Sequence, residues 1–254
     1  MILKCWNKQE REIYDMNSMQ IPAHVEQIIH TLNSHGYEAF AVGGCVRDSI
    51  LGRSPDDWDI TTSAKPEQVK ALFHRTVDTG LQHGTVTVLM EKEGYEVTTY
   101  RVDGEYEDGR HPKEVTFTAS LEEDLKRRDF TINAMAYNDE VGLVDPFNGM
   151  EDIEHYKIRC VGRAEDRFSE DALRILRAIR FASQLGFVVD SDVSLNIHKM
   201  YKNLENISIE RINSEFCKIA LSSEFYIQIG LFREVFSLFI PEIKDMFDFP
   251  QNNP

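Results

Sequence analysis

Hydrophobic positions in the first part of the chain follow two periods. Residues 25–36 (VEQIIHTLNSHG) have apolar residues at helical spacing and end in Gly36, which predicts an amphipathic helix with a glycine cap. YEAFAVGG (37–44) predicts a strand that runs into a glycine turn, and DWDITTS (57–63) predicts a second strand. GTVTVLME (84–91) and YEVTTYRV (95–102) alternate with period two around EKEG, which predicts a hairpin.

The pattern changes near residue 155. Before it, EVTFT (114–118) predicts a strand, LEEDLKRRDFTINAMAYN (121–138) is typical of a largely helical segment, and VGLVDPFNGMEDI (141–153) predicts a strand and a turn. After it, four long segments have helical spacing, at 169–186, 190–206, 208–223 and 224–239. We therefore expect an N-terminal extension (1–20), a mixed α/β head with a mixed β-sheet (21–155), and an all-α neck with the start of a further body (156–254).

Composition narrows the class of protein. The 254 residues are 42% hydrophobic with a mean hydropathy of −0.38, which predicts a soluble protein with a substantial core. The N-terminal segment has no signal-peptide pattern, and we expect a cytoplasmic protein without membrane partners. The four cysteines lack CxxC spacing, which argues against a zinc site and against a disulfide scaffold.

Net charge first argues against a nucleic-acid partner. The chain carries 43 acids and 28 bases, a net charge of −15, whereas phosphate contacts need Lys and Arg. Between Lys157 and Arg180, however, seven bases stand against four acids. This segment is a candidate basic stripe in an acidic protein.

The cluster PDDWD holds the first candidate chemistry. On a strand, Asp57 and Asp59 place both carboxylates on one face, while Trp58 points to the other. Two such carboxylates suit one or two Mg²⁺ ions that also bind phosphate oxygens. Glu96, on another predicted strand, is a candidate third acid. A polar strand edge and a solvated strand acid are the alternatives that these residues leave open.

Two glycines and an arginine precede this cluster. Gly43 and Gly44 allow the backbone to approach a triphosphate and to present N–H groups to it, and Arg47 adds a bidentate cation. A plain turn would have the same letters, but the combination with the aspartates favours a nucleotide–metal site.

Four motifs in order resemble one family. They are GGCVRDSILGRSPDDWDI (43–60), EEDLKRRDFTINAMA (122–136), DPFNG (145–149) and SEDALRILRAIRFASQLGF (169–187). Over residues 22–220 the chain is similar to the class II tRNA nucleotidyltransferases. These CCA-adding enzymes belong, with the bacterial poly(A) polymerases, to the polymerase-beta-like superfamily. The resemblance implies an α/β catalytic head and a helical neck.

The resemblance also implies roles for individual residues. Asp57 and Asp59 match metal ligands, and Glu96 matches the third catalytic acid. Gly43, Gly44 and Arg47 match the triphosphate contacts. Arg128 matches a nucleotide-binding arginine and Asp129 a ribose contact.

The last motif has a helical wheel with two halves. Its polar half consists of charged residues that we expect to bind nucleotide and primer: Glu170, Asp171, Arg174, Arg177 and Arg180. A solvated helix face would look the same, but Asp171 and Arg174 match the family's base-recognising pair. Asp171 only accepts and Arg174 only donates hydrogen bonds, so together they complement cytosine and adenine, whereas uracil and guanine present the opposite pattern.

These residues predict addition of C, C and A to the tRNA 3′ end from CTP and ATP. Addition of A alone, poly(A) synthesis, and nucleotide or RNA binding without turnover remain as alternatives. The loop VDGEYEDGRHPKEV (102–115) favours CCA addition, because it matches a segment of CCA- and A-adding enzymes that CC-adding relatives lack. The chain resembles a form truncated before an HD-type body domain, which puts its affinity for tRNA in doubt. The sequence leaves the oligomeric state and the preferred metal open.

Overall fold

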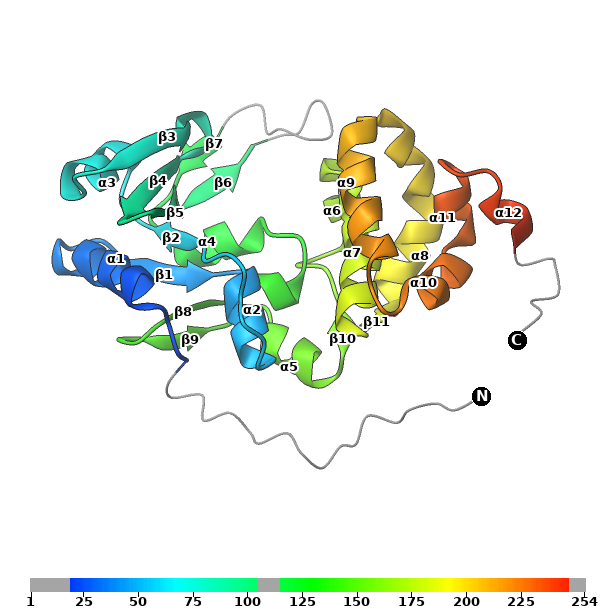
Figure 1. The fold of residues 1–254 in the computed structure, drawn as a ribbon, viewed down its shortest axis with the longest axis horizontal. Helices are drawn as coiled ribbons and strands as arrows, with labels where there is room; N and C mark the ends of the chain where they lie inside the picture. The colour runs from blue at the N-terminus through cyan, green and yellow to red at the C-terminus, as the bar shows by residue number, and fades with distance from the viewer. Residues whose placement is uncertain (1–18, 105–114, 247–254) are drawn as a thin grey trace.

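The computed structural model describes residues 19–104 and 115–246, arranged as an α/β head and a helical neck side by side (Figure 1). Residues 1–18 of the predicted N-terminal extension and residues 105–114 of the predicted loop lie outside the described residues. The expected fold class is confirmed: the head has a mixed sheet, and helices dominate the neck. The boundary near residue 155 stays a prediction.

A seven-stranded sheet forms the head. Its neighbours are antiparallel except for one central parallel pair, β2 with β5, in which Ile60 is opposite Val97. In spatial order the strands are β3 Thr76–Gly80, β4 Thr85–Met90, β5 Glu93–Thr99, β2 Ile60–Thr62, β1 Ala39–Val42, β8 Ala136–Asn138 and β9 Gly142–Val144. The predicted hairpin is confirmed as β4 and β5.

Strand alternation in β1 divides the core of the head into two layers. Ala39 and Ala41 pack on the side that α1 (Ala23–Ser34) and α3 (Pro66–Leu72) cover, whereas Phe40 and Val42 pack with Leu125 of α4 (Leu121–Lys126). The head is completed by helices α2 (Gly44–Ile50) and α5 (Gly149–Glu154) and by the small antiparallel pair β6 (Arg101–Asp103) and β7 (Val115–Phe117).

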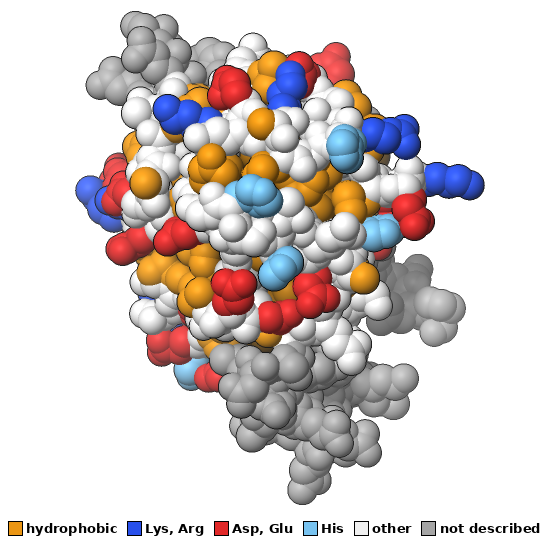
Figure 2. Space-filling model, turned by 90° about the vertical axis from the view of Figure 1, so that its left-hand side faces the viewer, with side chains coloured by type: hydrophobic (Ala, Val, Ile, Leu, Met, Phe, Trp, Pro, Cys, Tyr) orange, Lys and Arg blue, Asp and Glu red, His pale blue; other side chains and the backbone are white. Residues whose placement is uncertain are grey.

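On the end of the head turned away from the neck, acidic, basic and hydrophobic side chains are interspersed (Figure 2).

The neck is built around α7, which is buried on most sides. A short parallel pair of strands, β10 (Lys157–Ile158) and β11 (Val188–Val189), joins the segment before α6 to the segment after α7. The helices are α6 Ala164–Glu170, α7 Leu173–Leu185, α8 Ser191–Met200, α9 Ile209–Ala220, α10 Phe225–Leu231, α11 Arg233–Ser237 and α12 Ile243–Met246. None of the described helices is long and apolar enough to cross a membrane.

Three predicted elements differ from the structure. The second strand begins at Ile60, so Asp57 and Asp59 lie on the segment before it. The helix expected across Glu170 is two helices, because the chain is extended at Asp171 between α6 and α7. The segment 121–138 is helical only at its start, since a 3-10 turn and β8 follow α4.

The DPFNG motif forms the turn that starts α5. Both carboxylate oxygens of Asp145 accept backbone N–H groups, from Gly149 and Met150, each at 2.8 Å. A Cβ on Gly149 would lie 2.3 Å from the carbonyl oxygen of Thr131, so only glycine fits at this contact.

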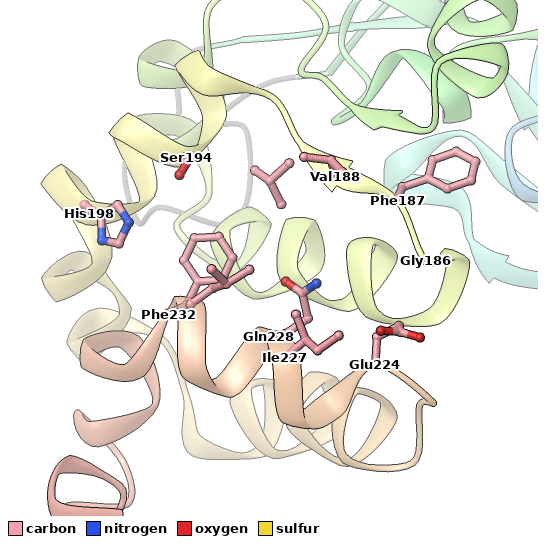
Figure 3. A pocket seen from close by; sticks show the side chains of 11 residues that line it. Gly186, Phe187, Val188, Ser194, His198, Glu224, Ile227, Gln228 and Phe232 are labelled. Atoms are coloured by element: carbon pink, nitrogen blue, oxygen red, sulfur yellow. The ribbon is translucent and has the colours of Figure 1, made fainter. Parts of the chain in front are cut away.

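The neck also contains a hollow of about 400 Å³ between β11, α8 and α10 (Figure 3). Phe187, Val188, Ile227 and Phe232 give it a largely apolar lining, and the amide of Gln228 lies among them. None of the predicted site residues lines this hollow.

Arginine side chains from both units meet at the junction of head and neck. The guanidinium carbons of Arg47, Arg177 and Arg180 lie 5.1, 5.4 and 4.4 Å from the ring centre of Phe181. Phe181 in turn packs edge-on against Phe130 of the head, with ring centres 5.7 Å apart. The junction therefore concentrates cations around one aromatic ring.

Asp129 supplies the negative charge on the head side. Arg177 Nη2 lies 2.6 Å and its Nε 2.7 Å from Asp129 Oδ2, and Asn133 and the Phe130 N–H donate to Oδ1. Burial alone would raise the pKa of Asp129, but Arg177 and Arg174 outweigh it and bring that pKa from an ordinary 3.8 to about 2.

The Asp129→Asn variant tests this junction. A depressed pKa means that the carboxylate stabilises the fold above pH about 4, and that this contribution is lost as the pH falls through about 2. At pH 7 we expect the variant to be less stable by about 2 kcal/mol, from about 1.4 kcal/mol per pKa unit. Urea denaturation between pH 7 and pH 3 measures the difference, which should be constant down to about pH 5 and narrow below about pH 4.

The exposed Asp166 on α6 provides the matched control. Asp166→Asn should change the free energy of unfolding by less than about 0.5 kcal/mol. If the Asp129 and Asp166 variants are equally stable, the Asp129–Arg177 ion pair does not stabilise the junction.

Candidate nucleotide and metal site

The three predicted acids lie at one edge of the two parallel strands. The amide of Val42 donates to the carbonyl oxygen of Asp59 at 3.0 Å, which holds the segment before β2 against the end of β1. Because Ile60 is opposite Val97, Glu96 on β5 lies level with Asp59. Trp58 is partly buried against the core, as the period-two argument predicted, while Asp57 and Asp59 are exposed.

Electrostatics show that these carboxylates repel one another. Although both side chains reach solvent, surrounding protein atoms partly desolvate them, and this desolvation raises the pKa of each. Asp59 and Asp57 raise the pKa of Glu96 further. For Asp59, Arg128 lowers the pKa and Asp57 raises it. A divalent cation with oxygen ligands would relieve this repulsion, so the donor set fits such an ion.

The predicted metal ligands are a pair rather than a full cage. Across residues 19–104 and 115–246, no group of three or more His, Cys, Asp or Glu side chains is spaced to hold a metal ion. Two carboxylates with the remaining positions left to water and phosphate oxygens are the arrangement that Mg²⁺ commonly takes.

The glycine turn lies against Arg128. Gly43 has a φ of +83°, and a Cβ there would lie 2.9 Å from Arg128 Nη1. Burial lowers the pKa of Arg128, and within the described part of the chain its Nε has no hydrogen-bond partner. A buried guanidinium with an unused donor beside a glycine turn and Asp59 is suited to bind an anion.

Arg47 is more enclosed than the sequence predicted. The residue is 8% exposed; Nε and Nη2 donate to the two oxygens of Asp48 at 2.9 and 2.8 Å, and Nη1 donates to Asn133 Oδ1 at 2.6 Å. Gly44 begins α2, one turn before Arg47, and lies next to the Arg47 guanidinium. A triphosphate contact by Arg47 stays a prediction.

The motif of the neck meets the head at residues 127–129. Arg174 Nη2 donates to the Arg127 carbonyl at 3.3 Å, and its Nη1 lies 2.5 Å from Glu170 Oε2. Arg128 neighbours Asp59, and Asp129 pairs with Arg177. Residues 127–129 therefore connect the carboxylates of the predicted metal site to α7. Two residues of the charged half, Arg174 and Arg177, therefore contact the head instead of forming a solvated face.

Two further residues on α9 hold this motif, and the sequence analysis missed both. Arg211 Nη2 lies 2.7 Å from Asp171 Oδ2. Glu215 is 6% exposed and its Oε2 lies 3.2 Å from Arg180 Nε. The two residues are four positions apart on an amphipathic helix, which places both on one face. This spacing could have identified them from the sequence. Asn133 was missed as well, although it lies within the second motif, 122–136.

These contacts assemble two kinds of chemistry within one network. One end presents carboxylates that suit a metal and phosphate oxygens, and the other presents an acceptor, Asp171, and a donor, Arg174, that suit a base edge. Arginines lie between the two ends. This is the order of parts in a nucleoside triphosphate.

Comparisons with known proteins agree with this arrangement. Residues 39–159 match the Poly A polymerase head domain. A CCA-adding enzyme of Leuconostoc mesenteroides is 52% identical over 199 residues, which cover 78% of this chain and 50% of that protein. A CCA-adding enzyme of Geobacillus thermodenitrificans is 55% identical over 192 residues, which cover 76% of this chain and 48% of that protein.

A solved structure gives the same result. The crystal structure of the Bacillus stearothermophilus CCA-adding enzyme in complex with CTP superposes with a TM-score of 0.77 at 46% identity, over 85% of this chain and 53% of that one. The chain thus spans about half the length of the relatives it matches. Residues 39–159 are thus a Poly A polymerase head domain, and over the matched span the chain is a homologue of the CCA-adding enzymes.

Proposed function

We propose that the protein adds C, C and A to the 3′ end of tRNA from CTP and ATP and releases pyrophosphate. The observation that carries this is the connection of the Asp57–Asp59 pair to the Asp171–Arg174 pair through residues 127–129. Relatives named CCA-adding enzymes, one of them solved with CTP, support the choice of nucleotides. We place this activity in the cytoplasm.

The carboxylates of Asp57 and Asp59 would hold divalent cations, which we propose to be Mg²⁺ in a two-metal arrangement with Glu96 as the third acid. Bound there, Mg²⁺ would lower the pKa of the attacking hydroxyl and neutralise charge on the phosphates. The protein's own part is to orient the nucleotide: Gly43, Gly44 and Arg128 around the triphosphate, and Asp129 at the ribose.

Nucleotide choice would come from the neck. Asp171 Oδ1 accepts the Leu173 N–H at 3.0 Å, and Oδ2 is held by Arg211, so the carboxylate has a fixed direction. A fixed acceptor beside the Arg174 donor complements the amine and ring nitrogen of cytosine or adenine. The same pair would face like groups on uracil or guanine. Arg177 and Arg180 follow at successive turns of α7, where the phosphates of the bound nucleotide would lie.

The first test supplies the protein with Mg²⁺, a tRNA that lacks its 3′ CCA, and each labelled nucleoside triphosphate separately and together. We expect addition of C, C and A that stops at three nucleotides, read on a sequencing gel. Growth from ATP alone without a stop would indicate a poly(A) polymerase, and a single A on a tRNA that ends in CC would indicate A addition. Binding of CTP and ATP with no incorporation would show a binding fragment without turnover.

The same assay includes Asp59→Asn, with Asp78→Asn on β3 as a control for loss of an exposed carboxylate. Changes in the outer shell of metal sites already cost up to about a hundredfold. We therefore expect Asp59→Asn to lower incorporation by more than roughly a hundredfold, and Asp78→Asn to have little effect. Full incorporation by the Asp59 variant would rule out the metal assignment.

The Asp171→Ala variant tests base selection. Removal of the acceptor should reduce the preference for CTP over UTP, measured as the ratio of kcat/KM values, by roughly tenfold, the value of one hydrogen bond to a charged group. Asp166→Ala on α6 controls for loss of an acid near the motif, and circular dichroism checks that both variants fold. Continued exclusion of UTP and GTP by Asp171→Ala would contradict the template argument.

A further inference from the structure

A second hollow, which we call the junction hollow, lies between the head and the neck. It has a volume of about 530 Å³, space for more than ten water molecules at about 30 Å³ each. Arg53 and Ser54 line it from the segment after α2, and Lys218, Ser222 and Ser223 line it from the end of α9 and the turn after it. None of these five residues has a role in the function proposed above.

The charges in the junction hollow favour an anion. Neither Arg53 nor Lys218 forms an ion pair within the part of the chain that the structure describes, and Arg53 makes only a long contact, 3.5 Å, with the Gln184 carbonyl. Asp48 on the same wall is already paired with Arg47 at 2.8 Å. Asp56 is the remaining acid of the lining, so two cations face one carboxylate in a protein whose net charge is −15.

The junction hollow lies beyond the position proposed for the phosphates of the bound nucleotide. Along α7, Arg174 belongs to the base end, Arg177 and Arg180 come next, and Gln184 of the hollow follows about 15 Å beyond Arg174, at 1.5 Å per residue. Arg47 contacts both regions, because its guanidinium packs on Phe181 and also lines the hollow. This space therefore lies farther along α7 than the arginines proposed to bind the phosphates.

The chemistry of nucleotidyl transfer defines which ion that is. The RNA 3′-oxygen forms a bond to the α-phosphorus and loses its proton to solvent, while the bond from the α-phosphorus to the bridging oxygen breaks and its electron pair leaves with pyrophosphate. Attacking and leaving oxygens are in line, so pyrophosphate departs on the side opposite the RNA.

We propose that the junction hollow binds inorganic pyrophosphate as it leaves, with Arg53 and Lys218 as its cationic contacts and the hydroxyls of Ser54 and Ser223 as additional donors. The proposal rests on the function proposed above. Charge-assisted hydrogen bonds to phosphate oxygens are the strong class of such bonds, which suits a small, highly charged product.

The experiment measures pyrophosphate directly. Arg53→Ala and Lys218→Ala are compared with Arg75→Ala and Lys202→Ala, which remove exposed cations elsewhere on the molecule. Calorimetry gives the dissociation constant of inorganic pyrophosphate, and the incorporation assay gives its inhibition constant and the KM values for CTP and tRNA. We expect each hollow variant to raise both pyrophosphate constants by roughly tenfold, with less than about a twofold change in either KM and no change in the controls.

Other results would overturn the proposal. If the KM for tRNA rises in the hollow variants while the pyrophosphate constants stay the same, the cations contact RNA. If neither the KM for tRNA nor the pyrophosphate constants change, the hollow binds neither RNA nor pyrophosphate. If the unmodified protein incorporates no nucleotide, yet calorimetry shows pyrophosphate binding that Arg53→Ala and Lys218→Ala weaken, the anion site stands and the proposed function fails.

Discussion

The structure depends on the burial of guanidinium groups at one junction. Arg47, Arg177 and Arg180 surround Phe181, and Arg174 lies one turn away with 9% of its surface exposed. Cations are removed from water only where opposite charge or hydrogen-bond acceptors replace it. The acids Asp129, Glu215 and Glu170 meet this need from three separate segments. The arrangement of the head, α7 and α9 therefore follows from one requirement of charge balance.

This charge balance also makes the arginines suitable for the proposed function. A guanidinium held by carboxylates and an aromatic ring has few conformations left, so little entropy is lost when an anion binds. Burial and Asp124 act in opposite directions on the pKa of Arg128, and burial prevails. Even so, an arginine remains charged in proteins. A preorganised positive region inside an acidic protein also explains why net charge is a poor guide to its partners.

Like charges, rather than opposite ones, gather near the start of β2, in the middle of the sheet. Desolvation raises the pKa of Asp59 and of Glu96, neighbouring carboxylates raise both further, and Arg128 acts against this on Asp59. Such an arrangement costs stability unless a cation compensates it, and clusters of perturbed carboxylates are typical of functional sites. The two regions meet at residues 127–129, where backbone and side chains of one short segment contact both.

The sequence by itself determined the order of parts. Period-two alternation located the hairpin of β4 and β5, helical spacing located the neck, and the charged motifs identified the residues that the structure brings together, because local spacing fixes which side chains share a face. Only the tertiary structure decided where those faces lie. It ended α6 at Glu170 and placed the charged face of α7 against the head and α9, since Asp129 and Glu215, 48 and 35 residues away from their partners, provide the compensating charge. Asn133 lies within the second motif, but its role as a bridge between Arg47 and Asp129 follows from a contact between distant segments.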